Sequence, residues 1–128
     1  MAKQIIQTDA APAAVGPYSQ AVAAGPGKTV FLSGQIGLEP GTGELVSENF
    51  EGQVRQSFAN MQAVIEAAGG SLENIVKLTL FLTDLSKFAS ANAIMADVIP
   101  QPFPARSTIG VASLPKGAQF EVEAIIVI

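Results

Sequence analysis

The sequence predicts an α+β fold in which two helices cover one face of a β-sheet. Two segments of the 128-residue chain, 49–70 and 88–98, repeat apolar residues at spacings of three and four, the period of an amphipathic helix. Stretches rich in β-branched and aromatic residues precede, separate and follow them, so the order is strands, helix, strand, helix, strands. This order is typical of an α+β sandwich. Without an internal repeat or linker, a single domain over residues 1–128 is expected.

Residues 1–48 read as short strands and turns. The stretch "KTVFLSGQI" is rich in β-branched and aromatic residues, and "LEPGTGEL" has the proline and glycines of a loop. We expect the strands of this half to form a meander. The turn "PGTGE" lacks the lysine and the following helix of a phosphate-binding loop, so it predicts no phosphate site.

A helix is predicted from Asn49, where the apolar period changes. Gly69 and Gly70 end the pattern, as glycine commonly does at a helix C-terminus. The apolar stripe consists of Phe50, Val54, Phe58, Met61, Ile65 and Ala68. The next stretch, "VKLTLFLT", alternates as a half-buried strand does. Its predicted buried face carries Val76, Leu78, Leu80 and Leu82.

Asp84 is the expected N-cap of the second helix. This helix has a shorter apolar stripe, formed by Phe88, Ala91, Met95 and Val98. Three prolines, at positions 100, 102 and 104, stop the pattern, and the chain is expected to re-enter the sheet at about Ala105.

Two strand patterns close the chain. "RSTIGVA" and "FEVEAIIVI" are joined by the turn-forming "SLPKGAQ", so we expect the two strands to pair antiparallel. The end, "AIIVI", is apolar on both faces although a single layer of helices buries only one. Either another subunit buries the second face, or this strand simply lies in the middle of the sheet.

The composition disfavours several kinds of chemistry. The chain has no cysteine and no histidine, so zinc or haem sites, thiol nucleophiles and Ser-His-Asp triads are not expected. A net charge of -4 at pH 7 and seven scattered Lys and Arg residues indicate no nucleic-acid surface. Hydrophobic residues make up 48% and charged residues only 14%, which predicts apolar surface between subunits.

No membrane or secretory segment is expected. The start, "MAKQIIQTDA", lacks the apolar core of a signal peptide. No later stretch reaches the roughly 18 uninterrupted apolar residues of a membrane span. A cytoplasmic location is therefore the expectation.

Arg106 stands alone as a basic residue among proline, small and apolar residues in "FPARSTIGV". The period of two puts Arg106 and Thr108 on one side of their strand, and Glu121 and Glu123 on one side of theirs. If the two sides coincide, a guanidinium fork and a carboxylate base face the same space, which suits an anionic substrate. A structural salt bridge on a solvated sheet face is the simpler interpretation, and the residues alone favour it.

Tyr18 and the stretch "SGQ" are weaker candidates. Tyr18, the only tyrosine, follows a Gly-Pro turn, where its phenol is either a hydrogen-bond donor to a ligand or a partly buried packing group. Ser33 and Gly34 interrupt an apolar strand, which indicates either the close approach of a ligand or a β-bulge.

Four stretches together resemble the RidA/YjgF family: "GPYSQAV", "FLSGQIGLEPGTGELV", "AAGGSLENIVKLTLFLTDLSKF" and "FPARSTIGVASLPKGAQFEVEA". The combination of "PARS", "LPKGA" and "EVEA" is specific, and the resemblance covers nearly the whole chain. It implies a chorismate-mutase-like α+β fold, assembled as a homotrimer with three ligand clefts between neighbouring subunits. Such an assembly would explain the apolar last strand.

The resemblance also implies an activity, the hydrolysis of reactive 2-imino acids and their enamine tautomers to 2-oxo acids and ammonia. Substrates of this kind, such as 2-aminoacrylate and 2-iminobutanoate, are produced by pyridoxal-phosphate-dependent serine and threonine dehydratases. By the same resemblance, Arg106 binds the substrate carboxylate with the Thr108 backbone N–H, and Glu121 orients or deprotonates the attacking water. The implied cleft is further lined by Tyr18, Ser33 and Gly34. No metal or organic cofactor is implied.

The sequence departs from the family at two places. Many members of the imine-hydrolysing branch have cysteine where this chain has Thr108, and "NAIMADVIPQPF" is shorter and lacks the usual aromatic residues. Two alternative functions remain open, a regulatory or chaperone-like trimer that binds 2-oxo acids without turnover, and a ribonuclease or translation inhibitor. The acidic charge and the lack of histidine disfavour the second.

Overall fold

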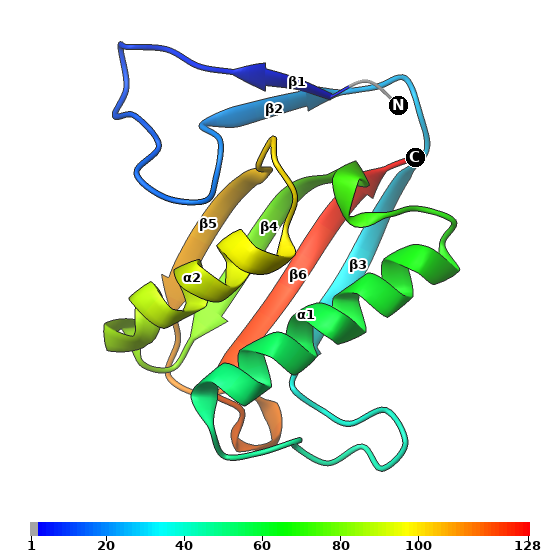
Figure 1. The fold of residues 1–128 in the computed structure, drawn as a ribbon, viewed down its shortest axis with the longest axis vertical. Coiled ribbons are helices and arrows are strands. Elements are labelled where there is room, and N and C mark those ends of the chain that lie inside the picture. Colours follow the sequence, from blue (N-terminus) through cyan, green and yellow to red (C-terminus); the bar gives the residue numbers. More distant parts are fainter. Residues whose placement is uncertain (1–2) are drawn as a thin grey trace.

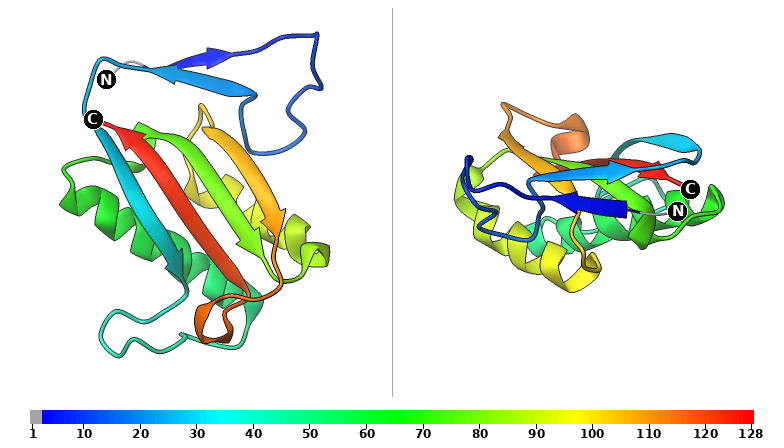
Figure 2. Two further views of the ribbon diagram at one scale, coloured as in Figure 1. Left: turned by 180° about the vertical axis from the view of Figure 1, so that it is seen from behind. Right: turned by 90° about the horizontal axis from the view of Figure 1, so that it is seen from above.

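The computed structural model describes residues 3–128 as a mixed four-stranded sheet with two α-helices on one face, beside a small hairpin (Figure 1). The sheet order is β3 (Thr29–Ile36), β6 (Phe120–Val127), β4 (Ile75–Leu82) and β5 (Ala105–Gly110). Strands β4 and β5 run parallel, and the other neighbours are antiparallel. Seen from behind, this sheet shows the face that the helices leave uncovered (Figure 2). The predicted α+β class is confirmed.

The prediction that "MAKQIIQTDA" is not a signal peptide falls partly on Met1 and Ala2. These two residues lie outside the described residues. Within residues 3–128, no helix combines the length and the apolar character that crossing a membrane requires.

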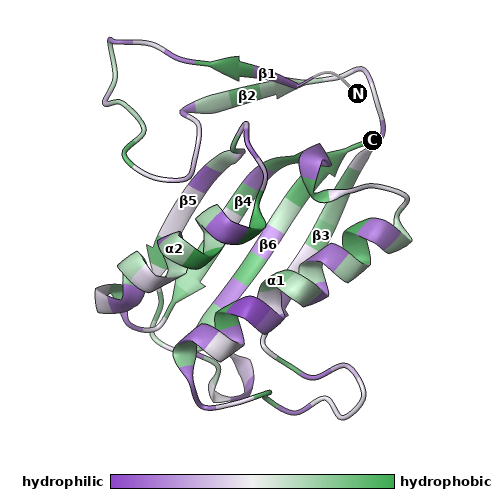
Figure 3. Ribbon diagram, in the orientation of Figure 1, coloured by the Kyte–Doolittle hydropathy of each residue, from purple (hydrophilic) through white to green (hydrophobic). Residues whose placement is uncertain are grey.

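Helix α1 (Phe50–Ala67) confirms the first predicted helix. It begins at the N-cap Asn49, whose Oδ1 accepts a hydrogen bond of 2.8 Å from the backbone N–H of Gly52. It ends before Gly69, which has a φ of +92°, a conformation that residues with a side chain rarely adopt. The helix packs its apolar stripe on the sheet, with the Phe58 ring 5.7 Å from that of Phe120 on β6. In Figure 3, polar residues mark its outer side.

Helix α2 (Phe88–Val98) confirms the second predicted helix, although its start differs from the prediction. Asp84 caps a 3₁₀ turn, Leu85–Lys87, by accepting a hydrogen bond of 2.9 Å from the backbone N–H of Ser86. Asp84 is therefore not the N-cap of α2 itself, because the 3₁₀ turn lies between them. The buried residues of α2 are Ala91, Ile94 and Met95.

The expected meander of the N-terminal half is wrong. Strands β1 (Lys3–Ile6) and β2 (Ala21–Ala24) form a separate antiparallel hairpin beyond one end of the sheet (Figure 1). Strand β3 pairs with β6 instead of β2. Burial accounts for this difference, since Leu32 of β3 belongs to the core under α1 whereas Ile6 of β1 is exposed.

The expected pairing of the two last strands is also wrong, because β4 lies between β5 and β6. The backbone N–H of Val111 donates to Leu82 O, and that of Thr83 donates to Gln119 O, so both ends of the connection are attached to the end of β4. The turn that holds Pro115–Gly117 thus carries the chain past β4. A position between β5 and β6 favours the burial of the apolar β4 residues Leu78, Leu80 and Leu82.

Val76 is not on the buried face of β4 as predicted. The register against β6 shifts between Ile75 and Lys77, so Ile75 is fully buried and Val76 is partly exposed. The other predicted members of that face, Leu78, Leu80 and Leu82, are fully buried.

The last strand, β6, lies in the middle of the sheet, as one of the two interpretations of "AIIVI" expected. Its helix-side residues, Val122, Ala124 and Ile126, are core residues. On the other face, Val127 is covered by the turn at Gly27, whereas Ile125 stays partly exposed.

Candidate functional site

Arg106 lies on the helix-covered face of the sheet, at the β5 edge. It pairs in register with Leu78, and Thr108 pairs with Leu80, whose side chains are both buried beneath the helices. Because β5 is the outermost strand, α2 covers this edge incompletely and both residues remain partly exposed. The predicted shared side of Arg106 and Thr108 is consistent with this register.

The guanidinium of Arg106 lies against two aromatic rings. Its central carbon lies 4.9 Å from the centre of the Tyr18 ring and 5.3 Å from that of Phe88. Its Nη1 donates a hydrogen bond of 2.6 Å to Oδ1 of Asn92 on α2. We call Tyr18, Phe88, Asn92, Arg106 and Thr108 the arginine cluster. Together these contacts hold the guanidinium in place before any ligand binds.

The arginine cluster lines a cavity of about 260 Å³, to which Val15 adds an exposed apolar side chain. Within the described part of the chain, Arg106 forms no ion pair with a carboxylate. Within the described residues of one chain, Arg106 therefore does not form the structural salt bridge that the simpler interpretation expected. Partial burial lowers the pKa of Arg106, but a guanidinium stays charged at neutral pH. The result is a pre-oriented cation with an open cavity beside it, which suits a carboxylate ligand.

Tyr18 reaches the cluster because the chain before β2 is attached to the start of β5. The backbone N–H of Tyr18 donates to Gly16 O in a tight turn around the buried Pro17. The next residue, Ser19, bridges to Ala105, and its backbone N–H donates to Pro104 O at 2.9 Å. The turn thus places the tyrosine ring against Arg106.

Glu121 lies on the uncovered face of the sheet. It pairs with Ile36 and Phe81, and its neighbours along β6, Phe120 and Val122, are fully buried on the helix side. Partial burial raises the pKa of Glu121, and the negative charge of Glu123 raises it further. Glu123, the other carboxylate on this side of β6, is exposed two residues further along the strand, opposite Thr79.

Gly34 provides the space that the Glu121 carboxylate occupies. The register of β3 shifts between Leu32 and Gln35, so Ser33 and Gly34 form a bulge, as one of the two interpretations of "SGQ" expected. A Cβ atom on Gly34 would lie 2.7 Å from the carboxyl carbon of Glu121, so any side chain here would displace that carboxylate. We call Ser33, Gly34 and Glu121 the glutamate cluster.

The two clusters do not meet within one chain. Arg106 is on the helix-covered face and Glu121 is on the opposite face, with the sheet between them. The side of β5 that carries Arg106 and the side of β6 that carries Glu121 therefore face in opposite directions. One chain alone cannot bring the two side chains together. Each cluster on its own is half of the predicted site.

Asn92 and Phe88 were missed as site residues by the sequence analysis. Phe88 was assigned to the apolar stripe of its helix, and Asn92 was not considered. The sequence did contain a sign of this. Asn92 is a polar residue four positions after Phe88 and three before Met95, so it lies on the apolar side of the helix.

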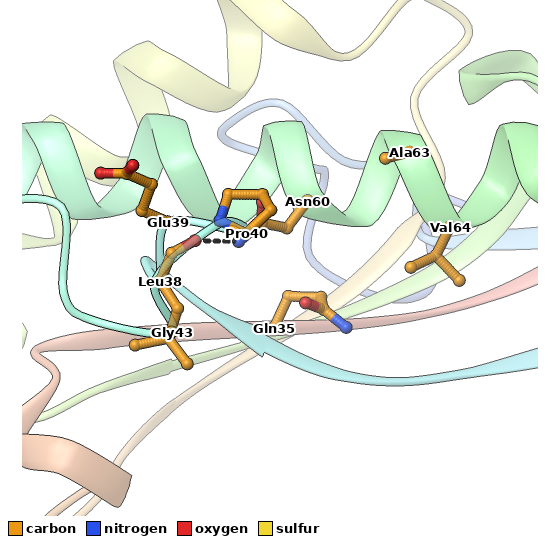
Figure 4. A pocket seen from close by; sticks show the side chains of 8 residues that line it. All are labelled: Gln35, Leu38, Glu39, Pro40, Gly43, Asn60, Ala63 and Val64. Carbon is orange, nitrogen blue, oxygen red and sulfur yellow. Dashed lines mark hydrogen bonds between the residues drawn. The ribbon is translucent and has the colours of Figure 1, made fainter.

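Two larger cavities offer less for an anionic ligand. One of about 340 Å³ lies between α1 and the loop after β3, where the amide of Asn60 bonds to Leu38 O and the only ionisable lining residue is Glu39 (Figure 4). The other, of about 410 Å³, contains Lys3, whose ammonium already donates to Pro102 O at 3.0 Å and to Ile75 O. The Arg106 cavity is therefore the best candidate.

Comparison with known proteins gives matches over nearly the whole chain. The family model described as Endoribonuclease L-PSP matches residues 8–128. A 2-iminobutanoate/2-iminopropanoate deaminase of Dermatophagoides farinae is 47% identical over 126 residues, which are 98% of this chain and 97% of that protein. The human protein of the same name is 42% identical over 123 residues, 96% and 88% of the two chains. The crystal structure of RidA from the Antarctic bacterium Psychrobacter sp. PAMC 21119 has a TM-score of 0.77 at 52% identity, over 98% and 99%.

Proposed function

Because the chain belongs to the RidA/YjgF family, whose model is described as Endoribonuclease L-PSP, we propose that it is an imine deaminase. It hydrolyses reactive 2-imino acids, such as 2-iminobutanoate and the imine tautomer of 2-aminoacrylate, to 2-oxo acids and ammonia. The observation that carries this proposal is the Arg106 guanidinium, which is fixed by two rings and an amide, lacks a carboxylate partner among residues 3–128 and borders a small cavity.

In this proposal Arg106 binds the substrate carboxylate. Its planar fork offers two parallel N–H donors, a geometry that a lysine ammonium lacks. Nη1 donates to Asn92 Oδ1 and to Met95 Sδ, and the two rings lie against the guanidinium. Nε and Nη2, which have no hydrogen-bond partner among residues 3–128, are left for the ligand. The Thr108 backbone N–H adds a donor to the same carboxylate. Tyr18, Ser33 and Gly34 line the cleft.

Glu121 acts on the water. The protonated imine carbon is already electrophilic, and Glu121 takes a proton from the water whose oxygen bonds to that carbon. Glu121 then gives this proton to the nitrogen and, as the C–N bond breaks, takes the hydroxyl proton, so that ammonia leaves and the 2-oxo acid forms. Loss of that last proton to the solvent or to ammonia returns Glu121 to its carboxylate form. A raised pKa suits a carboxylate that first accepts this proton and then returns it.

The complete site requires two subunits. Since Arg106 and Glu121 lie on opposite faces of one sheet, the arginine cluster of one chain must meet the glutamate cluster of its neighbour. Such a head-to-tail contact closes into a ring, which we take to be the homotrimer with three clefts. The uncovered sheet face supports this assembly, because Phe31 there is 75% exposed beside the partly exposed Ile125.

The substrates come from another enzyme. Pyridoxal-phosphate-dependent threonine and serine dehydratases release enamines that tautomerise to these imines, so a functional link to such enzymes is part of the proposal. The proposed hydrolysis needs no cofactor, because positioning and one base contribute ~10²-fold each.

A carboxylate-binding protein without turnover is the second candidate. It is favoured by the separation of the clusters, because Arg106, Asn92 and the two rings come from one chain and are sufficient for binding. Turnover also requires a base. Glu121 therefore has a catalytic role in the deaminase and none in the binding protein.

The proposed activity predicts faster release of 2-oxobutanoate from a threonine dehydratase reaction. The dehydratase and threonine are mixed with semicarbazide, which traps 2-iminobutanoate, and the two products are followed with and without this protein. We expect more 2-oxobutanoate and less trapped imine when the protein is present. The dehydratase with heat-denatured protein is the control. No acceleration by a preparation shown to be trimeric would refute the deaminase.

A further inference from the structure

The hydroxyl of Thr108 is a buried polar group without a partner. Its Oγ1 is shielded from solvent, and none of the residues from 3 to 128 offers it a hydrogen bond. Most buried hydroxyls in folded proteins are hydrogen-bonded, because an unpaired one destabilises the chain. A ligand that binds beside Thr108 could supply the missing hydrogen bond.

The position of Thr108 indicates what this partner is. Thr108 lines the same cavity as Arg106 and stands two residues after it on the same side of β5, about 7 Å along the strand. Oγ1 and the methyl group share the Cβ atom, so rotation about χ1 exchanges them. Since Oγ1 has no hydrogen-bond partner among residues 3–128, that exchange breaks no hydrogen bond there. The hydroxyl is thus available to a ligand held by Arg106.

We propose that the Thr108 hydroxyl donates a hydrogen bond to the substrate carboxylate, beside the Arg106 guanidinium. This inference rests on the proposed function. The carboxylate is the group that all 2-imino acids share, and a bidentate arginine leaves further lone pairs on its oxygens. This role is separate from that of the Thr108 backbone N–H, which is available whatever the side chain. It makes the threonine a specific determinant of affinity in this chain.

The test is a Thr108→Val substitution, which should weaken ligand binding without lowering the stability of the protein. Thr108→Val keeps the shape and the backbone N–H but removes the hydroxyl. Because that hydroxyl has no partner in the free chain, the thermal midpoint of the variant should be equal to or above that of the wild type. Ligand affinity should fall about tenfold, equivalent to about 1.4 kcal/mol. Thr108→Ser retains the hydroxyl and should keep most of the affinity.

Calorimetric titration with 2-oxobutanoate and with butanoate, which has the carboxylate but no oxo group, measures these affinities. The assembly of each variant is checked by light scattering. We expect Thr108→Val to weaken both ligands by similar factors. Unchanged affinity, a lower midpoint with unchanged affinity, or weakening of 2-oxobutanoate alone would each overturn the carboxylate contact. If wild-type protein bound neither ligand, the proposed function itself would fail, together with this inference.

Discussion

Replacing Arg106 with alanine will abolish the acceleration of 2-oxobutanoate release and weaken 2-oxo acid binding by roughly 10²-fold or more. The loss follows from the guanidinium, which is the only cation in its cavity and has no other ion-pair partner among the described residues. Arg106→Lys should not restore binding, because lysine lacks the planar fork. The coupled dehydratase assay and calorimetric titration measure the two losses.

The same substitution should leave the fold intact. Arg106 donates a hydrogen bond to Asn92, makes a longer one to Met95 Sδ and contacts two rings, so its removal costs about 1 kcal/mol and lowers the thermal midpoint by a few degrees. Arg55→Ala is the matched control, since Arg55 is exposed and reaches only Asp97, at 3.5 Å. It should change neither activity nor binding. Loss of the proposed trimer in Arg106→Ala would mean that this arginine has a structural role.

Replacing Glu121 with glutamine should slow turnover by about 10²-fold while 2-oxo acid binding stays nearly intact. Glutamine fits the same space beside Gly34 but cannot accept the proton of water. Glu123→Gln, on the same strand face, is the matched control and should remain active. Unchanged turnover in Glu121→Gln would remove Glu121 from the mechanism and leave the protein as a carboxylate-binding module.

The raised pKa of Glu121 fixes the direction of its effect on stability. A carboxyl whose pKa is higher in the folded than in the unfolded chain binds its proton more tightly when folded, so its ionisation opposes folding. Above the raised pKa, Glu121→Gln should therefore be at least as stable as the wild type. This advantage should disappear as the pH falls through that pKa. Thermal midpoints measured from neutral to acidic pH check this trend.

Local patterns predicted the helices well. The stripe from Phe50 to Ile65 and the glycines after it are properties of adjacent turns, and they gave α1 nearly to the residue. The bulge at Gly34 and the strand from Ala105 were likewise visible, because glycine and proline act on their own neighbourhood.

Pairing between distant segments was beyond such patterns. Alternation fixes which residues of a strand share a side, but not which strand lies next to it. For this reason β5 and β6 were expected to be neighbours although β4 separates them. The same uncertainty hid the main feature of the site, that Arg106 and Glu121 face opposite sides of one sheet. Asn92 was missed because its partner, the Arg106 guanidinium, is distant in sequence.

Subunit mixing tests most directly whether Arg106 of one chain works with Glu121 of its neighbour. Arg106→Ala and Glu121→Gln chains, each expected to keep no more than about a hundredth of the wild-type turnover, are unfolded together in equal amounts and refolded, and mixed trimers are verified by mass spectrometry. In random trimers about one interface in four joins an intact Arg106 to an intact Glu121, so we expect about a quarter of the wild-type rate. Verified mixed trimers that are no more active than the separate variants would contradict a site shared between subunits.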